Sequence, residues 1–528
     1  MARRLMLTAA AISFVLAGNA TAQIANTTRL GAVHFPTSCN DKAQTRFNQA
    51  MAYQHSFWYQ ASHEAFQDVL KADPSCAIAY WGIALSQMRI PWIPPSPENL
   101  TAGFAAVKKG QDLGAKTQRE RDYINAIAAF YTDHDQLDHR TRLLAYLRAV
   151  EKLAQAYPED EETQIYYALV LNIAASPADK TYANQLKAAA ILEEIVARQP
   201  DHPGAAHYLI HTYDYPALAA KGLDAARRYA KIAPDAPHAL HMPSHIFTRV
   251  GHWQDSIASN TIAARAAEKN NDSNEQLHFM DYLVYAYLQL GQDDKARAVV
   301  EEMKAISGVN PKFFVGPFAL AASPARYVVE RADWQGAAEL PVQASGFAFI
   351  DAISHFARAL GAARSGDPEA AKVDIARLAE LRDSLSEQGN AYWAQQVDIQ
   401  WQAATAWVLE AEGEHDQAIE ALTAAASLED RTEKHPVTPG PLAPARELLG
   451  EMLLERGQAK EALAAFEATL SKEPNRLQAY YRAARAAEQS GDAAKAGDYY
   501  AKVVELTADA GSARPEFAEA KSFVARLQ

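Results

Sequence analysis

Cysteine is almost absent from this sequence, which holds only Cys39 and Cys76 in 528 residues. Two cysteines are too few for a zinc site built from four cysteines, and their pairing would argue against a cysteine nucleophile. In an oxidising compartment, two cysteines near one end of a chain predict a single disulfide. We therefore expect a Cys39–Cys76 disulfide if the protein is exported.

An excess of positive charge is also missing, since the formal net charge is −13. An acidic chain without a basic stripe is a poor candidate for binding nucleic acid or anionic lipid. We expect no nucleic acid among its partners.

Long hydrophobic runs are missing, apart from a short one near the N-terminus. Residues 1–22 contain two arginines, an apolar stretch from Leu5 to Ala17, and the triplet Ala20-Thr21-Ala22. This is the pattern of a cleavable secretory signal peptide. The stretch is too short for a permanent anchor, and no later segment offers about 18 apolar residues. The sequence predicts cleavage after Ala22, a periplasmic or secreted location, and no integral membrane segment in the mature chain.

Common catalytic fingerprints are missing as well. The sequence has no G-x-S-x-G motif, no phosphate-binding loop and no dinucleotide fingerprint. Two HxxxH spacings occur, at His207/His211 and His241/His245, but neither has the glutamate that zinc proteases place after the first histidine. No enzyme class is indicated by motif alone.

What the sequence does contain is a helical repeat. Alanine-rich stretches with helical periodicity are separated by glycine and proline, which predicts an all-α protein. Residues 443–476 and the 34 residues after them share small residues at three positions: Gly450 and Ala484, Gly457 and Gly491, Ala462 and Ala496. This resembles the tetratricopeptide repeat (TPR), a 34-residue pair of helices.

The repeat predicts a TPR-type α-solenoid, a superhelix of antiparallel helix pairs. We expect TPR-like repeats in residues 23–200, histidine-rich central repeats in 201–310, further helical repeats in 311–425, and regular TPR repeats in 443–528. Residues 91–118 and 426–442 are rich in proline and polar residues, so they are predicted to be inserted loops.

Histidine is concentrated in the central repeats, where eight of the sixteen lie between His202 and His278. Helical spacing of three or four residues places side chains on one face. Three sets have this spacing: His207, His211 and Asp214; His238, His241 and His245; His278 and Asp281.

The resemblance to TPR domains implies that these positions lie on first helices and line a concave groove. Stacked first helices would then bring the sets to one patch, around residues 207–281. Imidazoles with a carboxylate at such spacing have the chemistry of a divalent transition-metal site. Zinc, iron(II), copper(II) and nickel are all compatible with these donors.

Several functions remain open for such a patch. A metal with an open coordination position would activate water or oxygen in a metal-dependent enzyme. It could instead brace three repeats. The alternative is a non-catalytic scaffold whose groove binds a peptide, a protein or a small molecule, with the histidines gripping the ligand or only packing.

Pro243 leaves one structural question open. Proline removes a helical hydrogen bond and clashes with the preceding turn. Either the helix kinks at Pro243 or a helix begins there, and in the second case His238 and His241 lie on a loop.

More specific stretches resemble a bacterial family of exported TPR proteins of largely uncharacterised function. They span most of residues 33–442 and read FPTSC, HSFWY, DPSCAIAYWG, DKTYANQLKAA, HPGAAHYLIHTYD, APHALHMPSHIFTRVG and KHPVTPGP. The resemblance implies the solenoid fold and an exported location, and it implies no reaction.

Overall fold

The computed structural model describes residues 28–89, 92–511 and 514–527, and the regular structure of these residues is helical throughout. The predicted signal peptide, residues 1–22, lies outside them. The N-terminal half contains α1 (Asp41–His55), α2 (Tyr59–Ala72), α3 (Ile78–Gln87), α4 (Pro97–Leu113), α5 (Gln118–Tyr131), α6 (His139–Ala156), α7 (Glu161–Ile173), α8 (Ala183–Arg198), α9 (Pro203–Tyr213), η1 (Ala219–Gly222), α10 (Leu223–Ile232), α11 (Pro237–His241), α12 (Pro243–Arg249) and α13 (Trp253–Lys269). The remainder contains α14 (Ser273–Gln289), α15 (Asp293–Ala305), α16 (Val315–Val329), α17 (Trp334–Ala338), α18 (Ala348–Arg364), α19 (Pro368–Glu387), α20 (Ala391–Ala411), α21 (His415–Asp430), α22 (Ala445–Glu455), α23 (Ala459–Lys472), α24 (Leu477–Gln489), α25 (Ala493–Leu506) and α26 (Pro515–Leu527).

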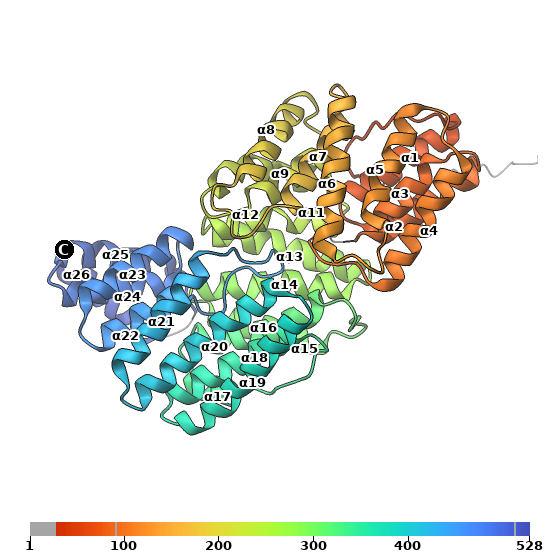
Figure 1. The fold of residues 1–528 in the computed structure, drawn as a ribbon. Coiled ribbons are helices and arrows are strands. Elements are labelled where there is room, and N and C mark those ends of the chain that lie inside the picture. Colours follow the sequence, from red (N-terminus) through yellow and green to blue (C-terminus); the bar gives the residue numbers. More distant parts are fainter. Residues whose placement is uncertain (1–27, 90–91, 512–513, 528) are drawn as a thin grey trace, which may run out of the picture.

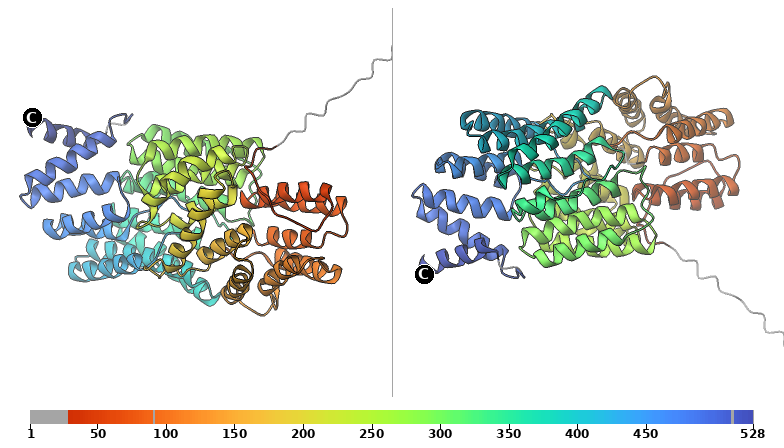
Figure 2. Two further views of the ribbon diagram at one scale, coloured as in Figure 1. Left: turned by 90° about the horizontal axis from the view of Figure 1, so that it is seen from above. Right: turned by 90° about the horizontal axis from the view of Figure 1, so that it is seen from below.

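Consecutive helices pair along the whole array. Contacts join α1 to α2, α13 to α14, α18 to α19 and α24 to α25. Helices α1–α6 lie at one end of the molecule and α22–α26 at the other, with α11–α16 between them (Figures 1 and 2). The predicted α-solenoid of helix pairs is confirmed.

The small residues of the repeat lie where the expected helices meet. Gly457 and Gly491 adopt φ values of 73° and 84°, a left-handed conformation that glycine accepts without a Cβ clash. A Cβ on Gly450 would lie 2.6 Å from the ring of Phe466. The repeat glycines therefore allow the turn between paired helices and their close crossing.

One predicted loop is wrong. Residues 91–118 contain α4, in which Ser96 is the N-cap and its side chain accepts a hydrogen bond from Asn99 N at 3.2 Å. Pro97 occupies the first turn, where its missing N–H leaves no helical bond unmade. A proline that we took as a loop signal begins a helix.

The second predicted loop is shifted. Helix α21 continues to Asp430, so the segment without helix runs over residues 431–444, which we call the strap. Lys180 Nζ donates to Thr432 O at 2.7 Å, and Tyr282 Oη donates to Pro436 O at 3.0 Å. The strap thus joins helix pairs that are far apart in the sequence.

The C-terminal repeats also contact the central ones. Trp253 Nε1 donates to Asn475 O at 2.8 Å, and α14 contacts α24. In an ideal solenoid each repeat contacts only its neighbours. Here the array folds back on itself, so the central helices are covered from several sides.

Cys39 and Cys76 form a disulfide, with Cα atoms 5.1 Å apart, as predicted. It joins the segment before α1 to the residues that lead into α3. Among the helices in the described part of the chain, none is long and apolar enough to cross a membrane.

Candidate metal centre

The predicted histidines come from four neighbouring helices. His207 and His211 lie on α9, and the remaining four on α11, α12 and α14. Helix α9 contacts α12, and α11 contacts α14. The expected side-by-side placement of these helices is present.

The chain stays helical at Pro243, although the helix is interrupted there. Met242, between α11 and α12, has φ −51° and ψ −36°, and its N–H donates to His238 O at 2.9 Å. Helix α12 begins at Pro243, as in the second alternative, but the residues before it form helix α11. Both His238 and His241 therefore lie on helix α11 and not on a loop.

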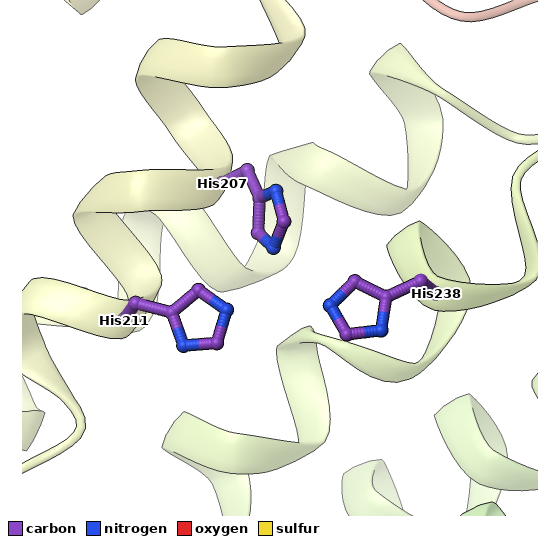
Figure 3. A group of neighbouring side chains, drawn as sticks. All are labelled: His207, His211 and His238. Atoms are coloured by element: carbon purple, nitrogen blue, oxygen red, sulfur yellow. The ribbon is translucent and has the colours of Figure 1, made fainter. Parts of the chain in front are cut away.

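The histidines divide into two groups of three. The first histidine group is His207, His211 and His238, and the second is His241, His245 and His278. In each group, one ring nitrogen per residue lies within 4.8 Å of the others. Figure 3 shows the three rings of the first group pointing toward one another. We expected one convergent set of histidines, and the structure has two adjacent groups.

In the first group the inward nitrogens have no protein partner. The Nε2 atoms of His207, His211 and His238 are buried and make no hydrogen bond. His207 Nδ1 donates to His55 O at 2.6 Å, so its proton is on Nδ1 and its Nε2 carries a lone pair. A buried nitrogen lone pair without a partner is the atom that a metal ion requires.

In the second group the proton positions follow from the neighbours. His245 Nδ1 donates to the carboxylate of Asp214 at 2.9 Å, and His241 Nδ1 donates to Asn260 Oδ1 at 2.6 Å. The Asn260 amide is oriented by its own bond, because Nδ2 donates to Ser256 O at 2.8 Å. Both imidazoles therefore carry the proton on Nδ1.

As a result, two lone pairs face each other. The Nε2 atoms of His241 and His245 lie 3.0 Å apart with no proton available to join them in the neutral rings. Two nitrogens at this separation, each about 2.1 Å from a shared ion, subtend an angle of about 90°. A tetrahedral ion would need about 3.4 Å between them. The spacing suits two adjacent positions of an octahedral or square-planar ion.

Asp214 holds the His245 ring through its Nδ1, on the side away from the contact between the Nε2 atoms. Its other oxygen accepts from Arg249 Nε at 2.8 Å and lies 3.6 Å from Lys434 Nζ. Burial alone would raise the pKa of this carboxyl, but Lys434, Arg249 and His245 together hold it well below its usual value. Asp214 therefore orients His245 as an ionised carboxylate and is not placed as a ligand itself.

Burial favours the neutral form of four of these imidazoles. It lowers the pKa of His207, His211 and His241 well below the usual value, and that of His278 to about 3. A histidine must be neutral to bind a metal. The rings are thus ready to act as ligands without losing a proton.

Asp281, the other carboxylate predicted as a ligand, does not belong to either histidine group. It accepts from Ser323 Oγ at 2.9 Å and pairs with Arg326 of α16. The three-residue spacing from His278 places both on one side of α14, but the arginine draws the carboxylate toward α16.

His55, Glu162 and His202 form a third cluster, which the sequence analysis missed and whose polar atoms are paired with protein atoms. His55 and His202 both donate from Nε2 to Glu162, at 2.9 and 3.0 Å. His202 Nδ1 accepts from Ala205 N, and His55 Nδ1 lies 3.0 Å from the hydroxyl of Tyr208. Every ring nitrogen has a partner, so this cluster braces the fold and leaves no lone pair for a metal.

The two histidine groups are buried and do not line an open groove. His207 and His241 have no exposed surface, and His238 alone of the six is more than slightly exposed. Phe57, Tyr229 and Tyr282 pack against the rings. A hollow of about 920 Å³ lies elsewhere, where the C-terminal repeats meet residues between 293 and 364. Its lining includes Arg331, Arg364, Arg482, Arg485 and Arg514.

Two residues that support the histidine groups could not be predicted from the sequence. Lys434 belongs to KHPVTPGP, a stretch already singled out in the sequence, although nothing there placed it beside Asp214. Asn260 carries no sequence signal at all. Its role follows only from the packing of α13 on α11.

Comparison with known proteins identifies one repeat and no function. The family model of the tetratricopeptide repeat matches residues 477–509. A search of curated proteins finds no match.

Solved structures with a similar helical array include the Cut9–Hcn1 hetero-tetramer of the APC/C (13% identity, 92% of this chain and 96% of that chain, TM-score 0.29). Another is the human IFIT1 dimer with m7Gppp-AAAA (12% identity, 82% and 90% of the two chains, TM-score 0.34). Likenesses this low carry no argument about function. The matched repeat and the continuous series of helix pairs identify the chain as a TPR-type α-solenoid.

Proposed function

We propose that the protein binds a divalent transition metal through its buried histidines. The observation that carries the proposal is the pair of Nε2 lone pairs on His241 and His245, 3.0 Å apart. In a protein interior such a contact between two acceptors is unfavourable unless something positive lies between them. A shared metal ion supplies that charge.

The donor set favours some metals over others. All the inward atoms are imidazole nitrogens, which suit copper, zinc, iron and nickel. The angle of about 90° expected between His241 and His245 favours copper(II) or iron(II) over tetrahedral zinc.

Three protein ligands leave coordination positions open on such an ion. An open position is what distinguishes a catalytic metal site from a closed structural one. We therefore favour a metal-dependent enzyme, in which the ion activates water or oxygen, over a metal that only braces the repeats.

The test is metal content after reconstitution. Metal-free protein is incubated with copper(II), iron(II) or zinc(II), passed through a desalting column and analysed by mass spectrometry of the elements. His245→Gln is expected to bind clearly less metal than the wild type while the helical circular dichroism stays unchanged. The matched control, His202→Gln, keeps a donor for Glu162 and is expected to retain the metal content of the wild type. Equal metal content in His245→Gln and the wild type would refute the proposal.

The alternative function, a scaffold for a peptide or protein, has its support at the 920 Å³ hollow. Its arginines and acids suit a polar peptide, and Arg485 is half-exposed, 3.8 Å from Glu519. Titration of acidic peptides into wild type and Arg485→Ala tests it, with weaker binding expected for the variant and equal binding contradicting the hypothesis.

The location is also a proposal. A disulfide persists in oxidising compartments, which supports an exported protein. Cell fractionation followed by N-terminal sequencing should find the mature chain outside the cytoplasm, beginning at Gln23.

A further inference from the structure

The two histidine groups lie as close to each other as the rings within each group. Between groups, the ring centroids of His211 and His245 are 5.7 Å apart, and those of His238 and His241 are 6.1 Å apart. Within groups the separations run from 4.7 to 6.2 Å. The six rings form one continuous cluster, so ions held in the two groups would be neighbours.

The cluster supplies little negative charge to such ions. All six donors are imidazole rings, which bring no negative charge of their own. Two carboxylates contact their outer faces: Asp214 at His245, and Glu275, with Oε2 3.6 Å from His238 Nδ1. Asp214 is already compensated by Arg249 and Lys434.

Two divalent ions would therefore bring a large uncompensated positive charge into a buried site. Uncompensated charge in a protein interior is strongly unfavourable. An anion between the ions removes much of this cost, because it is attracted by both and the attraction is strong at low dielectric.

We propose that the cluster binds two transition-metal ions together, one in each histidine group, with a small oxygen anion such as hydroxide bridging them. The inference rests on the metal binding proposed above and adds its stoichiometry and its ligand class. A bridge of this kind would be exchangeable, so the substrate class would be a small oxygen species that can bind two metals at once.

Titration of the metal-free wild type with copper(II) alone tests the pairing without any substitution. Calorimetry is expected to give two equivalents. The electron paramagnetic resonance signal at saturation is expected to fall well below that of two isolated ions, because neighbouring copper(II) spins couple.

Single substitutions in each group give the matched comparison. His238→Gln and His278→Gln are each expected to halve the stoichiometry and to restore the full signal of one isolated ion. His202→Gln, from the closed third cluster, is expected to keep two coupled ions. The wild-type titration decides the question by itself if a variant does not fold.

Azide, a small anion that replaces hydroxide on copper(II), tests the bridge. Its charge-transfer band is expected to saturate at one azide for each copper pair in wild type. The band should reach no more than the level of an isolated copper complex in His238→Gln.

The outcomes separate the two proposals. The bridged pair would be overturned, and metal binding left in place, by any of four results. These are two ions with full isolated signals, one ion in total, one azide per ion, or no azide binding. Binding of no copper at all would overturn metal binding itself.

Discussion

The Nε2 atoms of His241 and His245 lie 3.0 Å apart, and both rings direct their Nδ1 protons away from that contact, toward Asn260 and Asp214. The proton positions are thus fixed by atoms outside the centre. In metal-binding histidines, a hydrogen bond from the other ring nitrogen commonly fixes the tautomer and the orientation of the ring.

Replacing Asp214 by asparagine should weaken metal binding. The amide can still accept a hydrogen bond from His245, but the negative charge that favours a metal-bound imidazole is lost. Such substitutions behind a ligand typically lower metal affinity by about 10–100-fold. Competition with a chromophoric chelator measures the change.

Asp281→Asn is the matched control for this experiment. Asp281 is equally buried and also pairs with an arginine, Arg326, but it does not contact either histidine group. It should lower stability and leave metal affinity unchanged. An equal loss of affinity in both variants would mean that Asp214 acts through general stability and not through His245.

The disulfide should contribute measurably to stability. Cys39 and Cys76 are 37 residues apart, and a cross-link closing a loop of this size contributes about 3–4 kcal/mol on chain-entropy grounds. The Cys39→Ala/Cys76→Ala double variant should unfold in less urea than the wild type. Dithiothreitol should lower the midpoint of the wild type only. An effect of dithiothreitol on the double variant would show that the shift has another cause.

The sequence predicted the parts of this structure that depend on local geometry. His207 and His211 share a face of α9 because they are four residues apart, and Gly457 and Gly491 mark turns because glycine accepts left-handed φ. The repeat also placed the histidine-bearing helices side by side. These predictions needed only helix periodicity and one repeat length.

Features that depend on distant partners could not be predicted in the same way. Asp281 has suitable spacing from His278, yet it pairs with Arg326, and only the packing of α16 on α14 determines that choice. Lys434 reaches Asp214 because the strap crosses the central helices. The division into two groups likewise depends on how α11, α12 and α14 are packed, which spacing within a helix does not specify.

Gly204 should not tolerate a methyl group. A Cβ at this position would lie 2.3 Å from Nδ1 of His55, the residue whose carbonyl accepts the proton of His207. Overpacking of this kind typically costs about 1–3 kcal/mol. Gly204→Ala should therefore lower the thermal midpoint and also the occupancy of the first histidine group. Gly511→Ala, where the Cβ meets nothing within 4 Å, is the control. An unchanged midpoint for Gly204→Ala would contradict the close approach.

Acid should destabilise the protein through histidines outside the two histidine groups as well. Burial, helped by the neighbouring charge of Arg142, lowers the pKa of His139 to about 4, and burial with Lys434 lowers that of His435 to about 3. In the unfolded chain both titrate near 6.5. Below that pH the unfolded state binds protons that the folded state does not, so the free energy of unfolding falls as pH decreases. Each group contributes up to about 1.4 kcal/mol per pH unit. Urea unfolding of metal-free protein between pH 7 and 5, where most carboxylates remain ionised, should show this slope. His139→Leu should have a shallower one, and an identical slope in the variant would show that His139 is not protonated preferentially in the unfolded state.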